Sequence, residues 1–236
     1  MVKSFAMPGT TTLILETSTP HASLAIAEAD GRWTEREFSS DRSHNALLFG
    51  PLAALLAIPG SSRIGRVLVG SGPGSYSGTR VGIAAAQGVA MVHHCQAVAV
   101  PSILAVPAAA DGVPCLVIGD ARRGSYWTAH VAGVGVGVGV GESLGLTDAT
   151  GLIATVSSAV AQEIPVVCFE DPARFSLPGE LLDQVQQEFP SAGRLWRAWC
   201  VATEATRAAW AAVAPQPIYL KPPHITPAKR PWLVPS

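Results

Sequence analysis

Short apolar segments alternate with longer segments of helical periodicity along the first part of the chain. Residues 11–18 (TTLILETS), 21–29 (HASLAIAEA) and 32–38 (RWTEREF) are strand-like segments separated by turns, and their direct succession predicts a three-stranded meander. Residues 43–57 (SHNALLFGPLAALLA) follow with leucines at helical spacing. Pro51 lies inside this helical pattern, so we expect a kink or a break there.

Further strand-like segments at residues 66–71 and 96–100 each precede a helical segment, which gives the first unit the order βββαβαβα. A second unit of the same type begins at residues 113–133 (VPCLVIGDARRGSYWTAHVAG), where an apolar strand meets a turn and another strand. We therefore expect two mixed α/β lobes, formed by residues 1–111 and 112–236.

The second lobe is less regular in sequence than the first. We expect a buried strand at residues 164–170 (IPVVCFE), an amphipathic helix at 178–189 (PGELLDQVQQEF) and a final helix at 202–214 (ATEATRAAWAAVA), followed by a Pro-rich basic tail. The alternating glycines and valines of residues 132–142 fit two structures, a strand with one bare face or a low-complexity hairpin tip. Both interpretations stay open.

Composition and charge argue against a protein that captures nucleic acid by itself. The chain has 236 residues, 48% of them apolar, and a net charge of −1, so it has no overall basic field for capturing nucleic acid by itself. The charge is uneven: residues 141–190 carry eight acidic residues against Arg174, whereas residues 191–236 carry six basic residues against Glu204. The basic tail is either solvated surface or a contact for an acidic partner.

The four cysteines are widely spaced and form no CxxC pair, as expected of reduced thiols in a cytosolic protein. The N-terminus has no long apolar run with a small-residue cleavage site. Residues 81–110 are uncharged but are interrupted by polar residues and prolines, which argues against a membrane span. We expect a cytoplasmic chain without a membrane segment.

A glycine-rich turn joins the strand at 66–71 to the helix of small residues. It fits neither the GxxxxGK[ST] phosphate loop nor the GxGxxG dinucleotide fingerprint, because a lysine and a third glycine are missing. We interpret it as a tight turn that starts a helix, with Ser75 or Ser77 as the N-cap. The residues of the turn are Gly72, Pro73, Gly74, Ser75, Tyr76, Ser77 and Gly78.

The helix after this turn has little side-chain bulk on any face. Gly82, Ala85, Ala86 and Val89 share one face, which suits close packing either in the core of the chain or against another subunit. On the second interpretation, a large residue at Gly82 or Ala86 would prevent pairing and leave the monomer folded.

Candidate catalytic groups are few. The six histidines include no HExxH pair, and no GxSxG elbow is present, so a zinc peptidase or a serine hydrolase has little support. Glu16 and Asp120 each stand at the end of a predicted strand, with Arg122 close to the second. Such carboxylates either bind magnesium and nucleotide phosphates or accept hydrogen bonds in turns.

Several segments occur in the order typical of one family. They are LILETSTPHASLAIAEADG, SHNALLFGPLAALL, VLVGSGPGSYSGTRVGIAAAQGVA, VPSILAVPAAA, VIGDARRGSYWTAHV and PIYLKP. The sequence resembles the TsaB family, also called YeaZ, over most of the first lobe, the start of the second and the tail. The resemblance implies a two-lobed actin-like ATPase (ribonuclease-H-like) fold, in which each lobe is a mixed sheet flanked by helices.

The resemblance also implies a function: a non-catalytic partner of TsaD, which transfers a threonylcarbamoyl group to the tRNA adenosine beside the anticodon. TsaE, an ATPase, joins the pair, and tRNA is met through the complex. When alone, the chain is expected to form a homodimer. No firmly bound cofactor is implied, although ATP or ADP with magnesium is expected at the interface of the complex. The implied partner surface comprises His44, Leu47, Leu48, Pro51, Arg80, Gly82, Ala85, Ala86 and Val89.

The sequence departs from this family at two points. Family members usually have Asp where Glu16 stands, and the longer carboxylate disfavours independent use of ATP. The Gly/Val run is also foreign to the family. The alternative functions are an active actin-like kinase or ATPase that uses Glu16 and Asp120 and, with less support, a peptidase.

Overall fold

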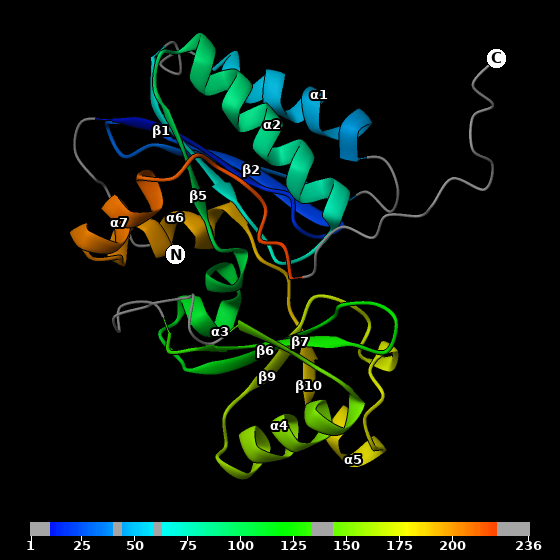
Figure 1. Ribbon diagram of the computed structural model, residues 1–236. Coiled ribbons are helices and arrows are strands. Elements are labelled where there is room, and N and C mark those ends of the chain that lie inside the picture. Colours follow the sequence, from blue (N-terminus) through cyan, green and yellow to red (C-terminus); the bar gives the residue numbers. More distant parts are fainter. Residues whose placement is uncertain (1–9, 40–43, 59–62, 134–143, 221–236) are drawn as a thin grey trace, which may run out of the picture.

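The computed structural model describes residues 10–39, 44–58, 63–133 and 144–220. A five-stranded mixed sheet in the order β3-β2-β1-β4-β5 forms the first lobe (Figure 1). β1, β2 and β3 are antiparallel neighbours, which confirms the predicted meander, whereas β4 and β5 continue the sheet in parallel with β1. The strands are β1 (Thr11–Glu16), β2 (His21–Ala27), β3 (Trp33–Ser39), β4 (Ile64–Gly70) and β5 (Gln96–Val100).

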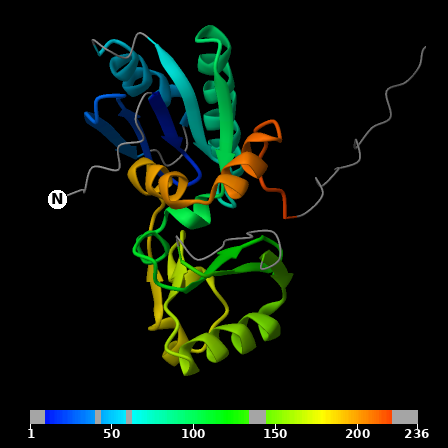
Figure 2. The ribbon, with the colours of Figure 1, turned by 90° about the vertical axis from the view of Figure 1, so that its left-hand side faces the viewer.

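Helices α1 (His44–Leu56) and α2 (Tyr76–Val92) lie side by side on one face of this sheet (Figures 1 and 2). α1 is one continuous helix with Pro51 inside it, so of the expected kink or break, the break is absent. The leucine stripe of α1 and the small residues of α2 pack on alternate residues of β1, β2 and β4 as one apolar cluster. Burial of this stripe holds α1 together in spite of its proline.

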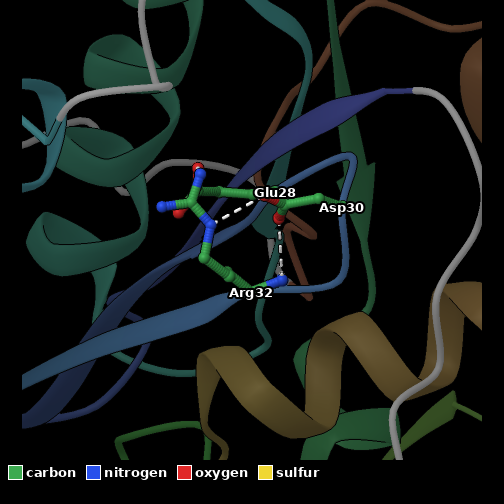
Figure 3. A network of polar contacts seen from close by, with 3 residues as sticks. All are labelled: Glu28, Asp30 and Arg32. Atoms are coloured by element: carbon green, nitrogen blue, oxygen red, sulfur yellow. Dashed lines mark hydrogen bonds and ion pairs between the residues drawn. The ribbon is translucent and has the colours of Figure 1, made fainter.

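The turn between β2 and β3 is closed by a compact polar network (Figure 3). Arg32 forms ion pairs of 2.7 Å with Glu28 and with Asp30, and its amide donates a further hydrogen bond to Asp30. The hydrogen bond from the Arg32 amide, followed by those from its guanidinium, lowers the pKa of Asp30. Gly31 has a φ of 88°, which suits glycine at the tip of a tight turn.

The second lobe contains another five-stranded mixed sheet, in the order β10-β9-β6-β7-β8. Its strands are β6 (Cys115–Asp120), β7 (Tyr126–Val131), β8 (Leu144–Thr147), β9 (Val166–Cys168) and β10 (Val185–Gln187). α4 (Ala149–Ala161) and α5 (Gly179–Leu182) cover the face turned away from the first lobe (Figure 1). The Gly/Val residues 134–143 lie outside the described residues, so neither interpretation of that run is tested.

One predicted element of the second lobe is wrong. The segment at 178–189 is not a single amphipathic helix: α5 ends at Leu182, and Val185 begins strand β10. β10 pairs in parallel with β9, and the side chain of Val185 is buried. Pairing with a neighbouring strand therefore outweighs the local helical pattern. Helix α4 had no counterpart among the predicted elements.

The chain returns to the first lobe after β10. α6 (Ala192–Val201) and α7 (Glu204–Ala211), counted with the second lobe in the sequence-based division, pack on the face of the first sheet opposite α1 and α2 (Figure 2). The other short helices are η1 (Ser102–Ala105), α3 (Pro107–Ala110) and η2 (Pro172–Arg174). One apolar cluster joins η1, α3 and α6 to the inner faces of both sheets, so the two lobes share a core.

Candidate partner-binding surface and glycine-rich turn

Contacts within the chain occupy the backbone of the glycine-rich turn. The amides of Gly72 and Ser75 donate to Ser102 Oγ (3.0 Å) and to the carbonyl of Ser18 (2.6 Å). Of the two predicted candidates, Ser75 is the N-cap of α2, because its hydroxyl accepts a hydrogen bond from the Gly78 amide. A side chain at Gly74 would overlap with the Ser18 carbonyl. The turn therefore fastens α2 to the end of β1, and these three amides are already engaged.

Glu16 is fully buried at the end of β1. Its Oε1 accepts a hydrogen bond of 2.8 Å from the Ser18 amide, and its Oε2 has no hydrogen-bond partner among the described residues. Burial raises the pKa of this carboxyl, against the opposing effect of the neighbouring Ser18 and Ser102. Its full burial and its hydrogen bond from Ser18 therefore favour a structural role over that of a magnesium ligand open to solvent.

Asp120 belongs to a separate polar group on the hairpin between β6 and β7. It accepts a hydrogen bond of 2.6 Å from the Arg122 amide and pairs with the Arg122 guanidinium at 3.2 Å. Glu170 lies close to it, and burial, with the nearby charge of Asp120, raises the pKa of Glu170 to about 7. In the described part of the chain, no hydrogen bond or ion pair joins Glu16 to Asp120, and no three His, Cys, Asp or Glu residues form a group able to hold a metal.

The implied partner surface divides into a buried and an open part, and four of its residues need correction. Leu48, Gly82, Ala86 and Val89 are buried in the core of the chain itself, between α1, α2 and the sheet. At Gly82, a Cβ atom would overlap with Thr17 Oγ1, which shows that this side of α2 meets the end of β1. Close packing inside the chain thus explains these small residues, and they are not available to another subunit in this structure.

The outer side of α1 and α2, which we call the α1/α2 face, is open and has no acidic residue, and Arg80 is exposed at its start on α2. Leu47 is 44% exposed and Met91 is 77% exposed, whereas Pro51 and Ala85 are partly buried. His44, also named for the partner surface, begins α1. Small residues of both helices are exposed as well: Gly50, Ala54, Ala84 and Gly88. Ala84 and Gly88 could be found from the sequence by their helical offset from Gly82 and Ala86, but the choice of face needed the structure.

Arg80 fastens the C-terminal segment to the start of α2. Its Nε and Nη2 donate to the Tyr219 hydroxyl at 2.9 and 2.7 Å, and its guanidinium lies 4.0 Å from the ring centroid of Tyr76. The Ile218 amide also donates to the Ser71 carbonyl, and Gln87 Nε2 donates to the Pro215 carbonyl. Sequence reasoning missed Tyr219, whose role depends on a contact between residues 139 positions apart.

Comparison with known proteins places these features in context. The family model described as "TsaD: tRNA N6-adenosine threonylcarbamoyltransferase" matches residues 39–154. A crystal structure from Pseudomonas aeruginosa, described as an uncharacterized protein with similarity to peptidase YEAZ, has 20% identity and a TM-score of 0.62. YeaZ from Pseudomonas aeruginosa has 21% identity and a TM-score of 0.61. Each comparison covers 90% of this chain and 100% of the other. No curated protein sequence matches this chain significantly.

The two mixed sheets flanked by helices define the two-lobed actin-like ATPase fold, as predicted from the sequence. The chain therefore has the fold of YeaZ, and its residues 39–154 are similar to the tRNA N6-adenosine threonylcarbamoyltransferase family. No helix in the described residues is long and apolar enough to cross a membrane.

Proposed function

We propose that this chain is the non-catalytic partner subunit of TsaD, supporting transfer of the threonylcarbamoyl group to the tRNA adenosine beside the anticodon. The observation that carries the proposal is the α1/α2 face. It consists of small and apolar exposed residues, including Ala84, Gly88 and Met91, and it contains no acidic residue. Such a surface permits close approach of helices from a second subunit with little desolvation of charge.

The wider assembly follows from the same assignment. The pair acts in the cytoplasm, TsaE joins it, and tRNA is met through the complex. In the absence of TsaD, a second copy of this chain occupies the α1/α2 face. ATP or ADP with magnesium binds at the interface of the complex rather than firmly to this chain. The alternative of an actin-like kinase loses support because Glu16, its proposed magnesium ligand, is fully buried.

The test is light scattering coupled to size-exclusion chromatography on the chain, alone and mixed with the TsaD of the same organism. We expect a one-to-one complex for the natural chain and loss of that complex for Gly88→Arg. Gly88 is exposed and a Cβ there would meet no atom within 4 Å, so the fold tolerates the change. Gly179→Arg is the matched control, because Gly179 is equally unobstructed but lies in the second lobe.

Two outcomes contradict the proposal. If Gly88→Arg binds TsaD as well as Gly179→Arg does, the α1/α2 face is not the binding surface. If the natural chain forms no complex and hydrolyses ATP by itself, the kinase alternative replaces the partner function, and Asp120 becomes the first residue to test.

A further inference from the structure

Two arginines lie close together on the face of the first sheet opposite α1 and α2. Arg66 projects from β4, and Arg207 comes from α7. Their guanidinium carbons lie 4.9 and 5.9 Å from the ring centroid of the same residue, Trp199 of α6. Both arginine side chains are only partly buried, so solvent reaches this group.

This group of residues is rich in donors and poor in acceptors. Among the described residues, neither arginine takes part in an ion pair, and Arg66 makes no hydrogen bond. Arg207 Nη1 donates two long hydrogen bonds of 3.4 Å, to the carbonyls of Trp199 and Cys200 at the end of α6. The indole Nε1 of Trp199 is buried and has no acceptor within the described part of the chain.

The electrostatics are equally one-sided. Burial and then the positive charge of Arg207 lower the pKa of Arg66. The other titratable group that acts on Arg66 is the thiol of Cys200, and burial raises the pKa of this thiol to about 12, so it carries no charge at physiological pH. Two neighbouring guanidinium groups without a carboxylate repel one another, and an anion between them relieves this repulsion.

We propose that Arg66 and Arg207, beside Trp199, form a binding site for a phosphate group. Guanidinium groups match phosphate because their N–H donors are arranged to bind two of its oxygens together. The phosphate belongs either to the backbone of an RNA or to a small phosphate compound, and the chemistry of recognition is the same for both. The site lies on the opposite face of the sheet from the α1/α2 face (Figures 1 and 2). A subunit bound to the α1/α2 face therefore leaves the phosphate site accessible.

The first arm of the test uses inorganic phosphate and does not depend on the proposed function. We expect phosphate, compared with chloride at equal ionic strength, to raise the thermal midpoint of the full chain in a saturable manner. Arg66→Gln and Arg207→Gln should each weaken the apparent affinity at least about tenfold, since each removes hydrogen bonds to a charged group. Arg36→Gln is the control, because Arg36 lies exposed on β3 and, among the described residues, its side chain donates only to the carbonyl of Glu35.

The second arm uses an unmodified tRNA transcript and rests on the proposed function. If the phosphate belongs to RNA, each of the two variants lowers the slope of log affinity against log salt by about one, whereas Arg36→Gln does not. Loss of phosphate binding with unchanged tRNA binding assigns the site to a small phosphate compound. If the natural chain, Arg66→Gln and Arg207→Gln respond equally to phosphate and bind tRNA with equal salt dependence, the proposal is overturned.

A purely structural role for the two arginines has its own signature. If they serve only to pack against Trp199, Arg66→Gln lowers the midpoint by the same amount in phosphate and in chloride. Arg66→Lys distinguishes phosphate binding from a structural role further. It keeps the charge but loses the paired donors, so relative to Arg66→Gln it should restore only part of the rise in thermal midpoint that phosphate causes. Full restoration by lysine would show that charge alone suffices and would contradict paired recognition by the guanidinium.

Discussion

Alanine at Gly82 should destabilise the monomer, whereas the interface interpretation of the sequence expected a large residue there to prevent pairing and leave the monomer folded. The new Cβ would overlap with Thr17 Oγ1 and lie 3.4 Å from Thr17 Cβ. Thr17 is fully buried, and its hydroxyl donates a hydrogen bond of 2.9 Å to the Gly78 carbonyl. Relief of the overlap requires either a backbone shift or rotation of Thr17, which breaks that hydrogen bond.

The magnitude follows from comparison with Gly88 on the same helix. Overpacking or a lost buried hydrogen bond costs about 1–3 kcal/mol, and replacing glycine by alanine in a helix gains about 1 kcal/mol. Gly88→Ala receives the gain alone, because its Cβ would meet no atom within 4 Å. The free energy of unfolding of Gly82→Ala should therefore lie about 1–3 kcal/mol below that of Gly88→Ala.

Chemical denaturation of the isolated monomer measures this difference. Addition of Thr17→Ala to Gly82→Ala removes the overlapping atom, so a double-mutant cycle should show a favourable coupling between the two changes. The reasoning is refuted if Gly82→Ala and Gly88→Ala are equally stable, or if the cycle shows no coupling. Either result would mean that α2 does not pack on Thr17 as the structure has it.

Three further changes test other parts of the structure. As pH rises from 4 to 8, the natural chain should lose stability relative to Glu16→Gln. Because the pKa of Glu16 is raised in the folded state, its carboxyl contributes stability fully below the unfolded pKa, and this contribution is lost as pH rises through the folded pKa. Chemical denaturation of both proteins at several pH values measures the difference. Ser23→Ala should cost about 1–3 kcal/mol of unfolding free energy, because the buried Ala192 amide at the start of α6 loses its acceptor at 2.7 Å. Tyr219→Phe removes the acceptor for Arg80, so amide hydrogen exchange near residue 219 should accelerate with little change in global stability.

Each of these predictions has an outcome that contradicts it. A pH-independent difference between Glu16→Gln and the natural chain would show that Glu16 ionises normally. A negligible effect of Ser23→Ala would mean that another group accepts from the Ala192 amide. Unchanged exchange in Tyr219→Phe would show that the segment before residue 220 is held by its backbone contacts to Ser71 and Gln87 instead.

Periodicity revealed the regular part of the fold because local pattern and tertiary environment agree there. The three strands of the meander, the leucine stripe of α1 and the N-cap at Ser75 follow from residue type and spacing. The segment at 178–189 shows where this agreement fails, since a helical pattern yields to the pairing of Val185 with β9. Strand pairing between distant segments has no local signal, and the sequence-based division likewise gave no sign that α6 and α7 return to the first sheet.

The sequence by itself determined that α2 must pack closely, because a helix built from Gly82, Ala86 and Gly88 has no bulk to keep neighbours away. Only the tertiary structure decided which neighbour each residue meets. Thr17 and the first sheet occupy the side of Gly82, which leaves Gly88 on the open side. Likewise, Arg66 and Arg207 are 141 positions apart, and only the packing of α6 and α7 on the sheet brings both arginines to Trp199. The physical reason is that composition limits how near a neighbour can come, whereas its identity depends on long-range packing.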